Sequence, residues 1–177
     1  MSQRCLWLIC LLLMSSGRML SLDCNQFHQL QREYNWTAQH LLQRMGGKSP
    51  VECLEDKTAF RFPEKVLKPK LPQHAMMAVH EILQQHFGIF SRDLSQTGWE
   101  SRGVQRFLNG LALQIERLET CLPTKRWTNI LKLKRYFQRI QDYLKKKKYS
   151  KCAWEIVRKE TEVCFQYVDK LTMRMKN

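Results

Sequence analysis

Glycine and proline are scarce in this chain, with 7 and 5 occurrences among 177 residues. Most turns between strands use these two residues, so the composition disfavours a many-stranded β protein. The abundant residues are good helix formers, above all Leu, Lys, Gln, Glu and Arg. With 44% apolar and 26% charged residues, the chain is typical of one globular domain of ordinary size. The composition therefore favours an all-α fold.

Long apolar runs are also missing, since no stretch after the N-terminal region approaches the ~18 residues that a membrane-spanning helix needs. The run CLWLICLLLM at 5–14 is too short to span a bilayer, and it follows the basic Arg4. These are features of a secretory signal peptide. We expect a signal peptide at 1–22, cleaved between residues 17 and 22. We expect a single secreted, extracellular domain at 23–177 that does not insert into membranes.

Acidic residues are few, 16 against 30 Lys and Arg, which gives a net charge of +14. In a nuclear protein such a charge would indicate nucleic-acid binding. Behind a signal peptide we expect no nucleic-acid partner. The four lysines at 145–148 are interpreted as the solvated end of a helix, where cations favour the helix dipole. Weak attraction to heparan sulfate or to an acidic receptor face is the alternative.

Catalytic patterns are absent from the sequence, which has no Gly-rich phosphate loop, no G-x-S-x-G and no C-x-x-C. The stretch HEILQQH resembles a zinc motif, but His80 and His86 are six residues apart instead of four. They would diverge by about 240° around a helix. His86 falls among apolar positions, so we interpret it as a core histidine with a satisfied hydrogen bond. We expect neither an enzyme nor a cofactor or metal site.

Apolar residues recur with helical spacing in five segments, at 25–45, 74–90, 97–122, 125–147 and 151–175. A long connection, 46–73, contains several prolines and shows no clean period, whereas the later links are short. A connection of this length lets the first two helices run parallel. The pattern predicts a long-crossover four-helix cytokine bundle with a fifth helix.

Five cysteines remain after signal cleavage, in a compartment where disulfides are expected. Cys152 and Cys164 would lie ~18 Å apart on one helix, beyond the ~7 Å that a disulfide tolerates. Cys164 falls on an apolar stripe, so we expect a buried free thiol. Two arrangements of two disulfides remain open: Cys24–Cys121 with Cys53–Cys152, or Cys24–Cys152 with Cys53–Cys121.

The triplet Asn35-Trp36-Thr37 is an N-glycosylation sequon. Asn35 lies off the apolar stripe of its expected helix, so we expect a glycan there to project outward.

Four stretches closely resemble the type I interferons, the interferon alpha/beta family. They are YFQRIQDYLKKKKYSKCAWEIVR (136–158), HEILQQHFGIFS (80–91), CLEDKTAFRFP (53–63) and LETCL (118–122). The resemblance covers essentially the whole mature chain. It implies the pairings Cys24–Cys121 and Cys53–Cys152, the second of which would hold the long connection against the fifth helix.

The resemblance implies a secreted antiviral cytokine of innate immunity. Such a protein bridges the two chains of the heterodimeric type I interferon receptor at the cell surface and triggers Janus-kinase/STAT signalling. One alternative is another helical cytokine or hormone. The other is a cationic secreted protein that binds heparan sulfate or membranes.

Receptor contacts are implied in the same way. For the high-affinity receptor chain they are Leu54 as an apolar anchor, with Lys57 and Arg158 as cations facing acidic groups. We expect Arg158 to be exposed, because it lies about 100° from the apolar stripe of its helix. We also expect Arg158→Glu to abolish signalling while the fold persists.

For the low-affinity chain, the implied contacts are Phe87, Leu113 and Lys134. Glu162 and Val163 stand where mammalian family members often carry methionine and arginine. We therefore expect a chain from a non-mammalian vertebrate, with a receptor of its own lineage.

Overall fold

The computed structural model describes residues 24, 26–47, 51–124 and 127–176, so the expected signal peptide lies outside the described residues. These residues contain α2 (Phe27–Met45), α3 (Pro72–Phe90), α4 (Ser101–Glu119), α5 (Ile130–Lys146) and α6 (Lys151–Met173). Three short 3-10 segments accompany them: η1 (Val51–Asp56), η2 (Glu64–Leu67) and η3 (Ser95–Thr97). No strand occurs in the described ranges, which confirms the all-α prediction.

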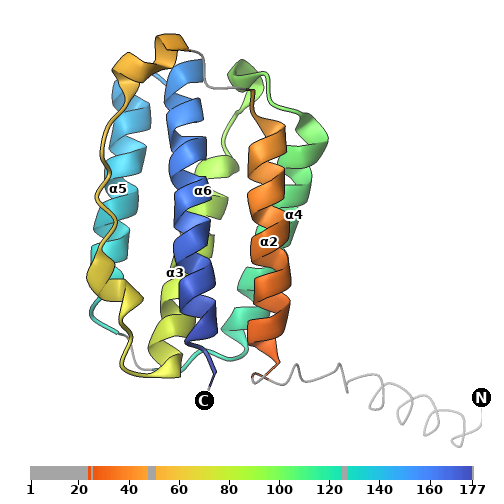
Figure 1. The fold of residues 1–177 in the computed structure, drawn as a ribbon, viewed down its shortest axis with the longest axis vertical. Helices are drawn as coiled ribbons and strands as arrows, with labels where there is room; N and C mark the ends of the chain where they lie inside the picture. Colours follow the sequence, from red (N-terminus) through yellow and green to blue (C-terminus); the bar gives the residue numbers. More distant parts are fainter. Residues whose placement is uncertain (1–23, 25, 48–50, 125–126, 177) are drawn as a thin grey trace, which may run out of the picture.

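The long connection gives the bundle its topology (Figure 1). After α2 ends, the chain crosses to the far side of the bundle, descends alongside α5 and enters α3 in the same direction as α2. Helices α4 and α6 run the opposite way. Helix α6 packs against α2, α3 and α5, and η1 packs against α6. This is the long crossover that the sequence predicts.

Helix starts follow local chemistry. Pro72 occupies the first turn of α3, where its missing N–H costs nothing. The Ser150 side chain accepts a hydrogen bond from the backbone N–H of Ala153 and caps α6. The third helix begins at Ser101 and not at 97, because Gly98 adopts a left-handed conformation and the Glu100 side chain caps α4. The expected boundary was therefore four residues early.

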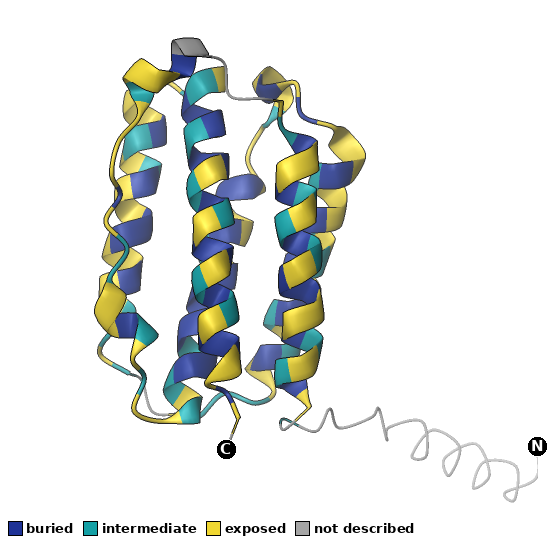
Figure 2. Ribbon diagram, in the orientation of Figure 1, coloured by how far each residue is buried: buried dark blue, intermediate teal, exposed yellow. Residues whose placement is uncertain are grey.

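The buried sides of all five helices face the bundle interior (Figure 2). His86 is part of this core. Its ring lies within 6.4 Å of the rings of Phe90, Phe137 and Phe165, and its Nδ1 is 2.8 Å from the carbonyl oxygen of Ile82. Burial lowers the pKa of His86 to about 4, although the hydrogen bond to Ile82 opposes the shift. The interpretation of a satisfied core histidine is confirmed.

Two disulfides fasten the chain, and they are the pairings that the resemblance implies. Cys24–Cys121 joins the start of α2 to the end of α4, with Cα atoms 5.7 Å apart. Cys53–Cys152 joins η1 to the start of α6, with Cα atoms 5.1 Å apart. Cys164 is a fully buried free thiol, and burial raises its pKa. A thiol in this position is inaccessible to a second molecule.

Candidate functional site

The segment η1 and the outer side of α6 together form a shallow apolar hollow of about 380 Å³. Leu54 at its rim is 63% exposed. We define the loop face as five of the residues that line this hollow: Leu54, Lys57, Ile156, Lys159 and Val163. Two of the three residues implied for high-affinity binding, Leu54 and Lys57, thus lie together on one surface.

Polar contacts from α5 fix the end of η1. The Tyr143 hydroxyl donates to the carbonyl oxygen of Asp56 at 2.9 Å, and Lys147 Nζ pairs with the Asp56 carboxylate at 2.5 Å. Burial and the nearby Asp56 charge raise the pKa of Tyr143 to about 12, so this hydroxyl remains a donor at physiological pH. One lysine of the tetralysine is therefore a structural partner of η1, and the interpretation of a wholly solvated helix end is wrong for Lys147.

The chain that follows η1 is also anchored. Phe60 is buried, and its ring meets the ring of Tyr143 edge to face at 5.2 Å. The Arg139 guanidinium donates to the carbonyl oxygens of Phe60 and Arg61, both at 3.0 Å. Arg61 has a positive φ of 56°, an uncommon backbone conformation for a residue with a side chain. These contacts hold the segment after Leu54 in a single path.

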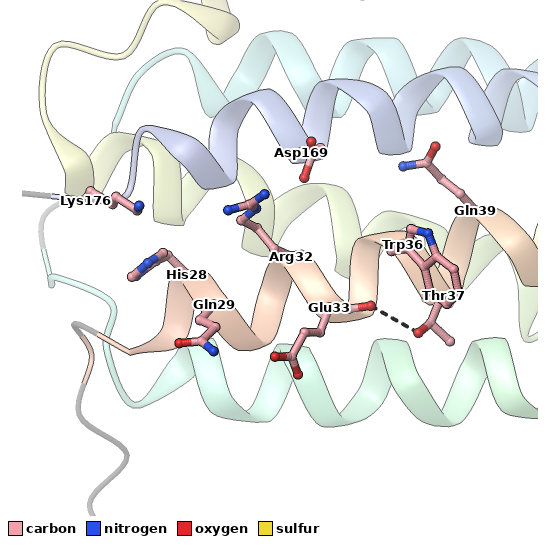
Figure 3. Close-up of a pocket in the computed structure, with 9 residues that line it drawn as sticks. All are labelled: His28, Gln29, Arg32, Glu33, Trp36, Thr37, Gln39, Asp169 and Lys176. Carbon is pink, nitrogen blue, oxygen red and sulfur yellow. Dashed lines mark hydrogen bonds between the residues drawn. The ribbon is translucent and has the colours of Figure 1, made fainter.

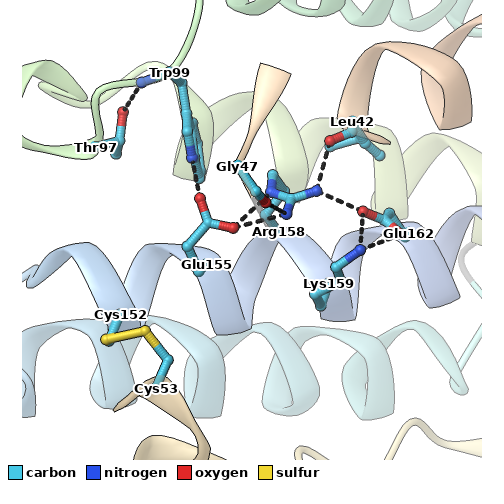
Figure 4. Close-up of polar contacts among 10 residues, drawn as sticks. All are labelled: Leu42, Gly47, Cys53, Thr97, Trp99, Cys152, Glu155, Arg158, Lys159 and Glu162. Carbon is cyan, nitrogen blue, oxygen red and sulfur yellow. Dashed lines mark hydrogen bonds and ion pairs between the residues drawn. A yellow bond between two sulfur atoms is a disulfide. The ribbon is translucent and has the colours of Figure 1, made fainter. Parts of the chain in front are cut away.

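Arg158 does not lie on the loop face. Its side chain is 1% exposed, so the expectation of an exposed receptor contact is wrong. The guanidinium pairs with Glu155 at 2.7 Å and with Glu162 at 2.6 Å (Figure 4). Replacing it with glutamate would bury a carboxylate between two others. From this geometry we now expect Arg158→Glu to destabilise the fold.

The same guanidinium caps the C-terminal end of α2. It donates to the carbonyl oxygen of Leu42 at 2.7 Å and to that of Gly47 at 3.1 Å (Figure 4). The last carbonyls of a helix lack partners within the helix and favour a nearby cation. A Cβ at Gly46 would lie 2.0 Å from Arg158 Nε, so the close approach of the guanidinium requires glycine here. Arg158 thereby fixes the chain where it leaves α2 toward η1.

A tryptophan extends this polar network to the segment before α4. Trp99 donates its indole N–H to Glu155 at 2.5 Å, while the other oxygen of Glu155 accepts from Arg158 (Figure 4). Every polar group of Arg158 and Glu155 is thus used inside the protein. Fully satisfied buried networks of this kind specify one arrangement of the elements that they join.

Sequence reasoning did not name Ile156 and Lys159 of the loop face, and it noted Val163 only as a departure from mammalian family members. A signal for them existed. Cys152 is tied to η1, so residues at steps of three or four from Cys152 point toward η1 on the same side of α6. Val163 on that side of the helix is exposed, and Ile156 is only partly buried against the edge of the core.

The residues implied for low-affinity binding lie on α3, α4 and α5. Phe87 is 38% exposed and Leu113 is 44% exposed, so both reach solvent from rigid helices. Lys134 is exposed, with its Nζ 4.0 Å from Glu81 of α3. Phe87 borders a hollow of about 370 Å³ between α3 and α4, and Lys134 borders one of about 470 Å³ between α3 and α5. We call Phe87, Leu113 and Lys134 the helical face.

The glycosylation sequon is buried at its asparagine. Asn35 is 1% exposed, and its Nδ2 donates to Thr172 Oγ1 of α6 at 3.1 Å. Its Oδ1 accepts from Gln31 at 2.8 Å. An N-linked glycan is attached through Nδ2, which here is buried and bonded to Thr172. The expectation that a glycan at Asn35 projects outward is therefore wrong for this fold. Asn35 instead joins α2 to α6.

A polar hollow of about 760 Å³ lies between α2 and α6 (Figure 3). The side chains around it carry both signs of charge, with Arg32 and Lys176 against Glu33 and Asp169. Trp36 at its edge is exposed and packs against the His40 ring at 4.1 Å. Because the charges offset one another, the hollow favours neither anions nor cations.

A family model described as the interferon alpha/beta domain matches residues 27–175. The chain belongs to the interferon alpha/beta family. It is therefore a cytokine and not an enzyme. Among the described residues, no helix is both long and apolar enough to cross a bilayer.

Related proteins agree with this assignment. The chain is 40% identical to interferon beta of Tachyglossus aculeatus aculeatus, with 80% of this chain and 81% of the relative aligned. It is 37% identical to interferon beta of Homo sapiens over the full length of both. Zebrafish interferon 1 shares the fold, with a TM-score of 0.74, 22% identity, and coverage of 85% of this chain and 99% of that one.

Proposed function

We propose that this family member is a secreted antiviral cytokine that bridges two chains of a cell-surface receptor and starts Janus-kinase/STAT signalling. The observation that carries the proposal is the loop face, where Leu54 is exposed on a segment that α5 and α6 hold rigidly. Exposed apolar anchors on preorganised surfaces lose little entropy on binding. Membership of the interferon family supplies the class of partner.

The two faces suit the two receptor chains. The loop face offers an apolar centre with the cations Lys57 and Lys159 around it, and the one carboxylate that lines the hollow, Glu160, accepts a hydrogen bond from Tyr136. This surface fits a high-affinity partner with apolar and acidic groups. The helical face lies on other helices and leaves the loop face free. Two receptor chains can therefore be held at once, which bridging requires.

Arg158 enters the proposal as a positioning residue. Because Arg158 is buried, it would affect receptor binding only indirectly, by fixing the path of the chain that leads from α2 to η1. Its substitution is expected to weaken binding of the high-affinity chain by disordering Leu54 and Lys57, without loss of a direct contact.

The test measures binding of each purified receptor ectodomain, from the same species as the chain, to single variants. Leu54→Ala is expected to weaken the high-affinity chain by at least ~30-fold, as for a central interface anchor. Leu71→Ala is the matched control, because Leu71 is another exposed leucine at the opposite end of the long connection. The control should change binding by less than about threefold.

Leu113→Ala separates the two faces. It should leave high-affinity binding unchanged and reduce STAT phosphorylation in cells. Equal effects of Leu54→Ala and Leu71→Ala would contradict the assignment of the loop face.

A further inference from the structure

The connection after η1 lies over the seam between α5 and α6. The Phe62 ring marks this position, because its centroid is 5.2 Å from that of Tyr136 on α5 and 4.4 Å from that of Tyr167 on α6. The next segment, η2, packs against both helices. Three separate parts of the chain, namely the long connection, α5 and α6, therefore border one strip of surface.

That strip is strongly cationic. A hollow of about 390 Å³ between η2 and the end of α6 is lined by the cations Lys68, Lys170 and Arg174 and the apolar residues Leu67 and Met173, with no carboxylate. All three cations are exposed. We call Lys68, Lys170 and Arg174 the cation trio.

Helix α5 continues the positive charge along the seam. Arg139 bonds the connection directly, and Lys132 lies seven residues earlier on the same side of the helix. Lys65 on η2 is also exposed. Among ion pairs between described residues, none uses any of these six cations.

Acidic neighbours are few on this strip. Glu64 lies at the start of η2, Asp142 accepts a hydrogen bond from Gln138 on α5, and Asp169 faces the hollow between α2 and α6. Glu160 of α6 also lies at the seam, where it accepts a hydrogen bond from the Tyr136 hydroxyl at 2.6 Å. Six cations thus stand against these four carboxylates. Unneutralised charge of one sign that is fixed on ordered elements attracts a polyanion.

The compartment narrows the choice of polyanion. Two disulfides indicate an oxidising, extracellular environment. Anionic lipids concentrate on the cytoplasmic leaflet, which an extracellular protein does not meet. Sulfated glycans of the cell surface are the abundant extracellular polyanions, and an elongated strip suits a linear chain. We propose that the cation trio and the adjoining seam form a binding site for a sulfated glycosaminoglycan.

The cation trio lies beside η2, at the opposite end of the long connection from η1 (Figure 1). A glycan bound at the trio therefore leaves the loop face accessible. It would concentrate the protein at cell surfaces beside its receptor. The inference does not depend on the receptor assignment, because it concerns only charge on the seam.

The experiment measures the Kd of the full mature chain for immobilised heparin at a series of NaCl concentrations. The variant Lys68→Gln/Lys170→Gln/Arg174→Gln removes the trio. The matched control Arg44→Gln/Arg102→Gln/Arg106→Gln removes three exposed cations from α2 and α4, on the other side of the bundle. Both variants have the same net charge.

We expect the trio variant to raise the Kd by about tenfold or more at 0.15 M NaCl and to flatten its salt dependence, as lost ionic contacts do. The control should change the Kd by less than about threefold. STAT phosphorylation in cells that lack sulfated glycans should be the same for both variants and the wild type.

Three results would overturn the proposal. Equal weakening by both variants would mean diffuse attraction by net charge. Equal binding of desulfated heparin would exclude recognition of sulfate. Tighter binding to phosphatidylserine vesicles than to heparin would assign the strip to a lipid surface.

Discussion

The loop face and the helical face both hold exposed side chains in fixed positions, but by different contacts. Leu54 lies on a short 3-10 segment that has little internal stability, and it is held by a disulfide, an ion pair, several hydrogen bonds and the Arg158 network. Phe87 and Leu113 lie on long helices whose opposite sides are buried in the core. An exposed apolar residue on a short segment needs dedicated tethers, whereas one on a packed helix is fixed by the core itself.

Removing one disulfide at a time gives the largest test of this difference. Both bonds close loops of nearly equal length, with separations of 97 and 99 residues. Loss of either is expected to lower the free energy of unfolding by about 4 to 5 kcal/mol. Only Cys53→Ser/Cys152→Ser should also weaken binding at the loop face, because that bond holds η1. Urea denaturation and receptor binding measure the two effects, and equal loss of binding in Cys24→Ser/Cys121→Ser would contradict the comparison.

Arg158→Ala tests the buried ion pairs of Arg158, which help to fix the chain at the end of α2. It leaves Glu155 buried without its cation, which is expected to lower the free energy of unfolding by about 3 to 4 kcal/mol. Amide hydrogen exchange should rise around Gly47 and η1 more than in α3. Lys159→Ala is the control, because Lys159 is half exposed and pairs with the same Glu162. Its cost should stay below about 1 kcal/mol.

Lowering the pH tests the part of the core that supports the helical face, because the buried His86 directly precedes Phe87 on α3. The folded pKa is about 4, below the ordinary value of about 6.5, so the unfolded chain binds the proton more readily. Stability from neutral His86 is present above pH 6.5 and is lost as the pH falls toward 4, by about 3 kcal/mol. Thermal melts from pH 7 to 4 measure it.

His86→Gln should remove this part of the pH dependence, and His40→Gln, at an exposed site, should retain it. If both variants melted with the wild-type pH profile, His86 would not be the titrating group.

The smallest expected effect comes from a pair of adjacent glycines. Gly46→Ala places a methyl group against the Arg158 guanidinium, which five hydrogen bonds prevent from moving freely. It should lower the free energy of unfolding by about 1 to 2 kcal/mol. Gly47→Ala meets no atom within 4 Å and should be nearly neutral. Equal melting temperatures for the two variants would show that the guanidinium is not fixed.

The helices were predictable because their apolar periodicity is a local property of the sequence. The tethers were not, because Arg158 meets carbonyls 111 and 116 residues earlier in the chain. A second failure has a different cause. Asn35 and Arg158 lie off the apolar stripes of their helices, but α2 and α6 are each covered on more than one side. Polar residues with internal partners fill the additional buried positions, and an apolar stripe does not reveal them.

The resemblance to the interferons supplied what periodicity could not. It indicated both disulfide pairings and the position of Leu54. It also carried over Arg158 as a surface contact, because a list of functionally important positions does not separate residues that touch a partner from those that shape the surface.

The long-range contacts that hold η1 and Phe60 in the described structure come from residues 139–152, in α5, the turn after it and the start of α6, which are synthesised late. A ribosome that has produced the chain only through α4 has already made Leu54 and Lys57, but nothing that fixes them in place. The proposed loop face therefore takes shape only once α6 has been made, and a product truncated before α6 would contain Leu54 and Lys57 without the contacts that position them.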